Sequence, residues 1–161
     1  MKSKERTSPH LLVRKARPDD MGIIISNNLA MAKETEGRDL EREAASNGVK
    51  GMIEDPRKGI YILAEVSGRV VGQCMITYEW SDWRNGDFWW LQSVYVIPEF
   101  RAQGIFGLIY EHVLAEARER SDVVGLRLYV EKGNRVAQDV YEHLGIKRSH
   151  YDMYEIDLTK K

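Results

Sequence analysis

The sequence is poor in cysteine, in net charge and in long apolar runs, and each shortage argues against a class of protein. Its one cysteine, Cys74, cannot form an internal disulfide or a cysteine-based zinc site, so we expect a cytoplasmic protein without a bound metal. The formal net charge is −1 and the charges are interspersed, which argues against nucleic acid as a partner because phosphate binding needs a basic excess or stripe. Apolar runs such as 91–97 are too short to span a membrane, so we expect no membrane partner.

What the sequence does contain is typical of one globular domain. A chain of 161 residues with 43% apolar and 30% charged residues can bury one core but hardly two. Residues 1–9 are charged and lack the apolar centre of a signal peptide, so we interpret them as a flexible N-terminal tail. Residues 10–161 are then expected to form a single domain.

Apolar periodicity predicts an alternation of strands and helices. Pro18 and the acidic pair after it suit a helix start, and the link Ser67-Gly68 has the residues of a tight hairpin turn. The predicted strands are 11–17, 60–66, 69–78, 88–97, 123–130 and 146–158, and the predicted helices are 18–37, 40–53, 104–120 and 134–145. This order predicts an α/β fold of the α+β kind, in which a mixed sheet carries helices on its faces.

The stretch from Gln92 to Tyr110 carries the strongest functional pattern. A buried strand runs into a proline-marked loop, which is followed by Arg101, Gly104 and a helix. Such a loop exposes main-chain N–H groups at the positive end of a helix dipole. Gly104 lets the backbone approach an anion closely, and Arg101 adds charge-assisted hydrogen bonds. The pattern predicts a phosphate cradle, although helix starts also carry Arg and Gly for packing and solvation alone.

The same residues resemble a known signature. Val94-Tyr95-Val96 followed by residues 101–106 resembles the acetyl-CoA signature of the GCN5-related N-acetyltransferase (GNAT) family, which is Arg/Gln-x-x-Gly-x-Gly/Ala after a strand. The family's second cofactor segment is resembled by Asn134, Ala137, Tyr141, Leu144 and Gly145. The order of the upstream elements is also similar to that of the family. The resemblance therefore implies a single-domain GNAT-like fold with a mixed, mostly antiparallel central sheet flanked by helices on both faces.

The resemblance implies acetyl-CoA as the acyl donor and gives roles to the first segment. The backbone of Val94 and Val96, on either side of Tyr95, would hydrogen-bond the pantetheine arm like an added strand. The N–H groups that would hold the pyrophosphate are those of Arg101, Ala102, Gln103, Gly104, Ile105 and Phe106. Phe106 departs from the signature, which has a small residue there, and it fits only if its side chain points into the core.

The second segment would complete the site. The resemblance implies that Asn134 contacts the pantetheine region or fixes the adjoining loop. Tyr141 would lie near the thioester sulfur, where its hydroxyl could protonate the departing thiolate. Plainer alternatives exist for both, since Asn134 is also a good helix cap and Tyr141 lies on an apolar helical stripe.

Acyl transfer to an amine needs a group that accepts the amine's proton. Glu79 is the first candidate, because it follows a strand at the edge of an aromatic segment whose burial could raise the pKa of the carboxyl. The alternative is a solvated turn carboxylate. Cys74 lies in an apolar strand without a basic neighbour, so an acyl-enzyme lacks support and we expect direct transfer in a ternary complex.

The acceptor is less well marked than the cofactor. Glu34 and Glu36, near the end of a predicted helix, could attract a cationic amine, although a polar helix end is the plainer interpretation. Tyr78, Trp80 and Trp83 could line an acceptor pocket through cation–π contacts. Both tryptophans fall in the predicted link 80–87, where they could instead form a subunit contact. A homodimer is therefore a further expectation.

The pattern and the resemblance together predict an N-acetyltransferase. It would move an acetyl group from acetyl-CoA to a primary amine of a small molecule or a peptide. One alternative is a non-catalytic acyl-CoA-binding or regulatory module on the same fold, and another is an interaction protein that uses the surface of residues 80–90.

Overall fold

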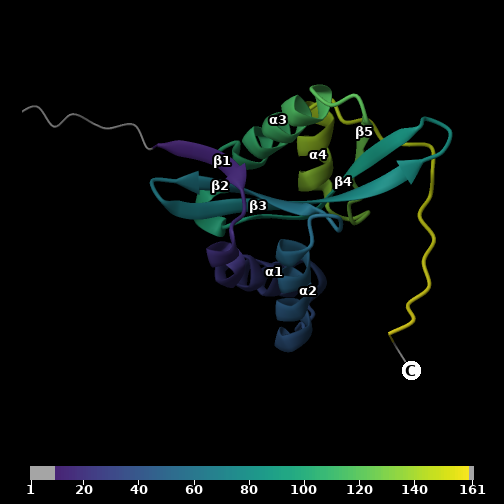
Figure 1. The fold of residues 1–161 in the computed structure, drawn as a ribbon. Coiled ribbons are helices and arrows are strands. Elements are labelled where there is room, and N and C mark those ends of the chain that lie inside the picture. The colour runs from purple at the N-terminus through teal and green to yellow at the C-terminus, as the bar shows by residue number, and fades with distance from the viewer. Residues whose placement is uncertain (1–9, 160–161) are drawn as a thin grey trace, which may run out of the picture. The chain divides into compact units, whose positions relative to one another are not determined.

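The computed structural model describes residues 10–159, so the predicted tail 1–9 lies outside the described residues. The chain divides after Tyr129 into two compact units, and each is described by itself. The first unit contains a five-stranded sheet in the order β1-β2-β3-β4-β5 (Figure 1). Its strands are β1 (Leu11–Lys15), β2 (Ile60–Val66), β3 (Arg69–Ser81), β4 (Gly86–Val96) and β5 (Val123–Arg127).

The sheet is mixed and mostly antiparallel, as predicted. Strands β1 to β4 form an antiparallel meander, and β5 pairs with β4 in parallel. Ser67 and Gly68 form the β2–β3 turn with φ values of 48° and 83°, which suit the twist of a two-residue hairpin. Because β3 extends to Ser81, Trp80 belongs to a strand and not to the predicted link, and it pairs with Asp87.

Helices cover both faces of this sheet, which confirms the layered arrangement (Figure 1). Two of them, α1 and α2, lie on one face, and α3 lies on the other. A short 3-10 turn, η1, leads into α1, and a second, η2, precedes α3. Their bounds are η1 (Pro18–Asp20), α1 (Met21–Glu36), α2 (Arg42–Glu54), η2 (Pro98–Phe100) and α3 (Ile105–Arg118).

The packing of the first unit follows from apolar residues on facing surfaces. Ile24 of α1 and Val49 of α2 are buried in one cluster with Leu63 of β2. On the other face, α3 approaches the backbone of β3 closely, since a Cβ atom at Gly72 would lie 2.7 Å from the side chain of Ile105. The start of α3 is therefore held directly against the middle of the sheet.

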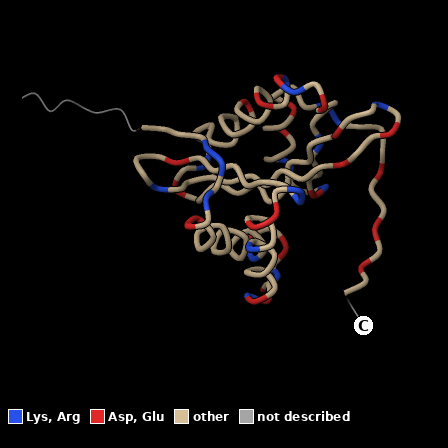
Figure 2. The backbone as a smooth tube through the Cα atoms, viewed as in Figure 1, with Lys and Arg blue, Asp and Glu red and all other residues tan. Residues whose placement is uncertain are grey.

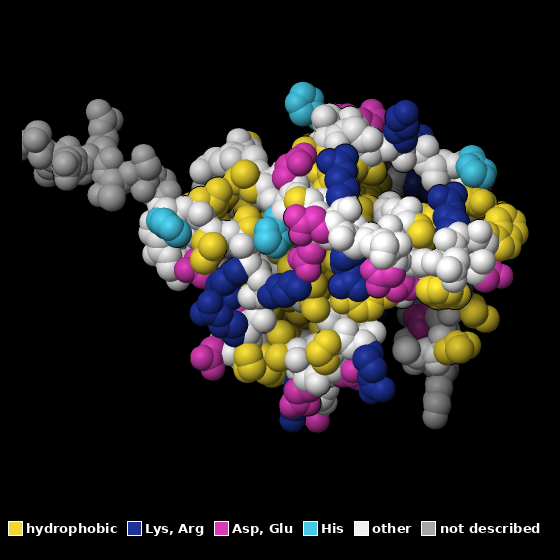
Figure 3. All heavy atoms as spheres, turned by 45° about the horizontal axis from the view of Figure 1, so that its top comes forward, with side chains coloured by type: hydrophobic (Ala, Val, Ile, Leu, Met, Phe, Trp, Pro, Cys, Tyr) yellow, Lys and Arg dark blue, Asp and Glu magenta, His cyan; other side chains and the backbone are white. Residues whose placement is uncertain are grey.

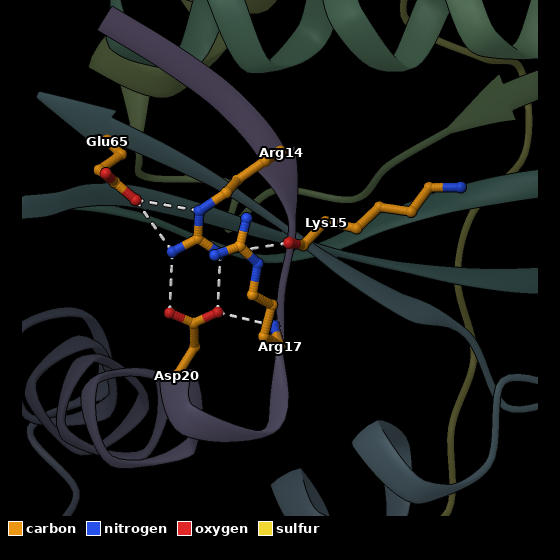
Figure 4. A network of polar contacts seen from close by, with 5 residues as sticks. All are labelled: Arg14, Lys15, Arg17, Asp20 and Glu65. Atoms are coloured by element: carbon orange, nitrogen blue, oxygen red, sulfur yellow. Dashed lines mark hydrogen bonds and ion pairs between the residues drawn. The ribbon is translucent and has the colours of Figure 1, made fainter. Parts of the chain in front are cut away.

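An ion-pair network joins β1 and β2 to the entry of α1 (Figure 4). The guanidinium of Arg14 contacts Asp20 at 2.7 Å and Glu65 at 2.9 Å, and all three side chains are largely buried. The hydrogen bond from Arg14 lowers the pKa of Asp20, and the hydrogen bond to Asp20 raises the pKa of Arg14. The network fixes where the chain leaves the first strand.

Charged residues of both signs alternate along the chain (Figure 2). Their side chains are intermixed on the face that Figure 3 presents, unlike the basic stripe that a nucleic-acid duplex needs. Among the helices within residues 10–159, none is both long enough and apolar enough to cross a membrane.

The second unit contains one helix, α4 (Arg135–His143), within its described residues. Asn134 caps this helix, because its Oδ1 accepts a hydrogen bond from the N–H of Ala137 at 3.1 Å. The predicted strand 146–158 is wrong, since the structure has no strand there, and β5 ends at Arg127 rather than at residue 130. Alternating apolar and acidic residues favour a strand, but the N–H and C=O groups of a strand also need a neighbouring edge.

Candidate functional site

A β-bulge interrupts β4 in the middle of the sheet. The register pairs Gln73 with Tyr95 but Met75 with Gln92, so β4 has one residue more than β3 between these pairs. Ser93 lies in the bulge and has a φ of 48°, which is unusual for a residue other than glycine. Its carbonyl accepts a hydrogen bond from the buried Gln73 side chain at 3.3 Å. The bulge is thus supported from within the core.

Beyond this bulge, one edge of β4 has no strand partner within the described sheet. The parallel register with β5 ends at the pair Trp90 and Arg127, whereas β4 continues to Val96. The N–H of Ile97 donates to the carbonyl of Val71 on β3 at 3.0 Å. Because successive residues of a strand face opposite sides, the N–H and C=O of Val96 point away from β3. An extended chain with amide groups could pair there.

This edge of β4 continues through η2 into an exposed turn, in which the N–H of Arg101 donates to the carbonyl of Pro98 at 3.2 Å. Residues 101–104 are exposed, and both Ala102 and Gly104 have positive φ values, 58° and 77°. Gly104 is the N-cap of α3, and the space where its Cβ would lie is open. Ile105 and Phe106 turn their side chains into the core. The bulky Phe106 therefore leaves the outer side of the turn to the backbone, as an anion site at a helix N-terminus requires.

Arg101, the first residue of this turn, is held by α1 and by β4. Its Nη2 donates to Glu34 at 2.6 Å, and its Nε donates to the carbonyl of Val96 at 2.8 Å. The hydroxyl of Tyr95 donates to the other oxygen of Glu34 at 2.8 Å. Arg101 and then Tyr95 lower the pKa of Glu34, while burial and then Glu34 raise the pKa of Tyr95. The structure thus brings a predicted acceptor residue, Glu34, to the predicted phosphate turn.

Glu79 lies in β3 and bridges three strands. It accepts hydrogen bonds from the indole N–H of Trp90 on β4 and from Nη1 of Arg127 on β5, the latter at 2.9 Å. The guanidinium of Arg127 lies 3.6 Å from the centre of the Phe88 ring. The ring of Tyr129 packs on that of Trp90, with 6.1 Å between centroids. Glu79 is therefore a paired and partly buried carboxylate and not a solvated turn residue.

The other predicted acceptor residues lie apart from this cluster. Tyr78 points to the opposite face of β3 from Glu79 and packs against Trp89 at 6.1 Å between centroids. Trp80 is 60% exposed in the strand, and Trp83 is 91% exposed in the turn after it. Glu36 contacts the exposed Arg38 at 3.4 Å.

A cavity that the sequence did not predict lies between α1, α2 and the bulge. Its volume is about 290 Å³. The side chains that line it are uncharged, and they are Asn28, Met31, Leu40, Ala45, Gly48, Val49, Tyr61, Met75 and Ser93. Its members are scattered over five elements and the α1–α2 link, so no local pattern indicated them.

Asn28, which lines this cavity, is connected to two buried amide side chains behind it. Gln73 donates to Oδ1 of Asn28 at 2.8 Å and accepts from Nδ2 of Asn27 at 3.0 Å. Asn28 in turn donates to the hydroxyl of Tyr61 at 3.4 Å. This chain of amides fixes the orientation of Asn28 and links it through Gln73 to the carbonyl of Ser93.

Two further predictions concern reactive groups. Burial raises the pKa of the Cys74 thiol to about 12, so the thiolate that an acyl-enzyme needs is not accessible at neutral pH. Within residues 10–159, no group of three or more His, Cys, Asp or Glu side chains is arranged to hold a metal ion.

Tyr141 and Asn134 belong to α4 and its cap in the second unit, where Tyr141 is half-buried.

Comparison with known sequences identifies a family. The profile of the Acetyltransferase (GNAT) family matches residues 26–146. A thialysine N-epsilon-acetyltransferase from Sus scrofa is 30% identical over 85% of this chain and 84% of that protein. The enzyme of the same name from Bos taurus is 36% identical over a shorter stretch, which is 47% of this chain and 44% of that protein.

Comparison with solved structures agrees. A possible acetyltransferase from Clostridium difficile 630 is 44% identical and has a TM-score of 0.86 over 92% of this chain and 97% of that chain. A predicted acetyltransferase with acetyl-CoA from Clostridium acetobutylicum shares the fold. It is 18% identical and has a TM-score of 0.75 over 94% of this chain and 99% of that chain.

Proposed function

The chain belongs to the acetyltransferase (GNAT) family, and from this premise we propose that it transfers an acetyl group from acetyl-CoA to a primary amine by direct transfer in a ternary complex. One observation carries the proposal. Strand β4 continues beyond its register with β5 to Val96 and leads through η2 into the exposed turn 101–104, where Ala102 and Gly104 have positive φ values. A ligand with an amide-bearing arm and a diphosphate would match both parts at once.

The donor fits this edge residue by residue. Val94 and Val96 would pair with the pantetheine amides, and the turn from Arg101 to Phe106 would hold the pyrophosphate through its main-chain N–H groups. Arg101 lies at the start of that turn with its charge 2.6 Å from Glu34, so it would move only a short way to reach a phosphate. Asn134 at the start of α4 would contact the pantetheine arm or fix the adjoining loop.

The acceptor is proposed to be an amine of a small molecule or a peptide. The thialysine N-epsilon-acetyltransferases are named for an amine substrate, which supports this class of acceptor. The amine nitrogen would attack the thioester carbonyl, so that a C–N bond forms while the C–S bond breaks. The thioester of acetyl-CoA supplies the activated acetyl group.

Two residues would handle the protons. Glu79 would accept the proton that the amine loses, through water, because Thr77 and Gln92 lie between it and the bulge on the same face of the sheet. The Tyr141 hydroxyl would give a proton to the departing thiolate. Glu34 and Glu36 would attract a cationic group of the acceptor. Tyr78 and Trp80 face the opposite side of β3 from Glu79, so they and Trp83 would contact only a part of the acceptor that extends beyond that side of the sheet.

A spectrophotometric assay of free thiol release tests the proposal. Acetyl-CoA should bind in titration calorimetry, and thiol release should depend on an added amine. Replacing Tyr141 with Phe should slow turnover more than it weakens acetyl-CoA binding, and equal turnover would remove its role as an acid. Binding without turnover of any amine would favour the non-catalytic module.

The exposed tryptophans motivate a proposal about assembly. Trp83 is almost fully exposed in the β3–β4 turn, and a homodimer that uses this turn would cover it. We place such a dimer in the cytoplasm, where the single cysteine would remain reduced. Sedimentation and turnover of Trp83→Ala, compared with the unchanged chain, distinguish the two roles. An interface role predicts dissociation, whereas a pocket role predicts lost turnover in an intact oligomer.

A further inference from the structure

We propose that the cavity between α1, α2 and the β-bulge binds the acceptor, and that the preferred acceptor is a compact monoamine with an apolar, uncharged body. This inference rests on the proposed function, since it names the substrate of the same site. Its starting point is position: Ser93, which lines the cavity, directly precedes Val94 at the start of the open edge of β4. A ligand in the cavity would reach the thioester from the bulge.

The lining selects against charge. None of the nine residues around the cavity is ionised at neutral pH, and most of the lining is apolar, including Met31, Leu40, Val49 and Met75. A charged group buried there without a partner would lose its hydration, which is costly. Apolar surface on the ligand would instead gain from burial. The body of the acceptor should therefore carry no charge besides its reactive amine.

Nearby carboxylates are already engaged. Glu34 contacts Arg101 and Tyr95, and Glu79 contacts Arg127 and Trp90. Each carboxylate therefore already faces a cation of the chain. A polycationic acceptor such as a polyamine would have to compete with Arg101 and Arg127 for these two carboxylates.

The polar residues of the lining suit a single amine. The hydroxyl of Tyr61 accepts from Asn28, which leaves its own proton available to a ligand, and Ser93 offers a second hydroxyl at the bulge. Burial in a lining without a carboxylate also lowers the pKa of a bound amine. A larger share of the amine is then neutral, and only the neutral form attacks the thioester.

The volume of the cavity favours a small acceptor. About 290 Å³ lies at the lower end of the range for small-molecule pockets. An amine of about ten heavy atoms fits this range, whereas an aminoglycoside does not. Extended or bulky acceptors would remain partly outside the cavity.

Gly48 offers a direct test, because it lines the cavity from α2 and its absent Cβ faces open space. Gly48→Leu should fill the cavity and lower kcat/KM for benzylamine and 3-methylbutylamine more than tenfold, with unchanged acetyl-CoA affinity. Gly22→Leu is the matched control: Gly22 also lies in a helix with open space around its Cβ, but outside the cavity. It should leave both measurements unchanged. Gly48→Ala gives a graded, smaller effect if the larger variant folds poorly.

The acceptor panel gives the second readout. In the unchanged protein, the two apolar monoamines should exceed spermidine, kanamycin and thialysine in kcat/KM by at least tenfold. The inference is overturned if a charged acceptor is preferred, or if Gly48→Leu and Gly22→Leu behave alike. In either case acetyl-CoA binding and turnover of another amine would still support the proposed function. Failure to bind acetyl-CoA would overturn both.

Discussion

Glu34 and Arg101 are separated by 67 residues, yet their side chains form an ion pair with 2.6 Å between Oε2 and Nη2. The sequence suggested one of them for the acceptor and the other for the pyrophosphate. Their contact ties α1, which lines the cavity, to the turn before α3. A change in one half of the site can therefore alter the other.

Removing the negative charge of Glu34 should strengthen cofactor binding. In Glu34→Gln, the positive charge of Arg101 would no longer be partly neutralised, so acetyl-CoA should bind roughly two- to fivefold more tightly at low salt. The difference should vanish at high salt. Calorimetry at two ionic strengths measures this, and Glu36→Gln serves as the control because Glu36 pairs with Arg38. Weaker binding by Glu34→Gln would mean that the ion pair orients Arg101.

A bulky residue at Gly104 should abolish acetyl-CoA binding. Gly104 has a φ of 77° and open space around its Cβ position, so a valine there would stand where the pyrophosphate is expected. Gly37→Val is the matched control, since Gly37 has a φ of 62° and the same open surroundings at the end of α1. Both variants should lose about 1–2 kcal/mol of stability from backbone strain. Only Gly104→Val should lose binding; equal affinities in the two variants would reject the cradle.

Glu79→Gln should depress turnover most at low pH. If Glu79 accepts the amine's proton, its loss matters most where the amine is largely protonated, and the deficit should shrink as pH rises. The amide oxygen of the substituted side chain would still accept the hydrogen bond from Trp90, so the fold should persist. The pH dependence of kcat/KM is the measurement, and a profile parallel to that of the unchanged protein would leave Glu79 with a structural role only.

The thiol of Cys74 should be unreactive in the folded protein. Its pKa is raised to about 12 by burial, so iodoacetamide at about pH 8 should label it only after denaturant is added. Cys74→Ala should retain turnover and lose about 1–2 kcal/mol of stability through a small cavity. A trapped acetyl-thioester on the unchanged protein would contradict direct transfer.

Folding stability should fall at acid pH as the Arg14 network is lost. The pKa of Asp20 lies below its ordinary value of 3.8, so the carboxylate stabilises the fold above that pH. This contribution is lost as pH decreases through the lowered pKa. Asp20→Asn should therefore cost about 2 kcal/mol at about pH 7 and much less at about pH 2. Urea titrations at the two pH values check it; equal losses at both would exclude a charge effect.

Local patterns predicted those parts of the fold that depend on neighbouring residues. Ser67-Gly68 favours a hairpin turn by its own conformation, and Gly37 ends α1 as predicted. The segment that joins β4 to α3 could be predicted because its backbone geometry follows from Pro98, Arg101 and Gly104. In each case the cause and the effect lie within a few residues.

Features that depend on distant pairing were missed. The bulge at Ser93 arises from the register of β3 with β4, and serine itself does not favour a positive φ. The cavity needs side chains from elements far apart in the chain, and whether 146–158 forms a strand depends on pairing that its own residues do not specify. The contact of Glu34 with Arg101 was not predicted either, because it has no trace in the local sequence.

The close approach of β3 and α3 has a consequence for mutational surveys. Gly72 pairs with Val96 in the sheet and offers no side chain to a ligand, yet any larger residue there would press on Ile105. Displacement of α3 would shift the main-chain N–H groups of the preceding turn relative to β4, although none of the residues proposed to contact acetyl-CoA would be changed. A mutational survey limited to predicted binding residues would not include Gly72. A natural substitution there would therefore weaken acetyl-CoA binding although no predicted binding residue had changed.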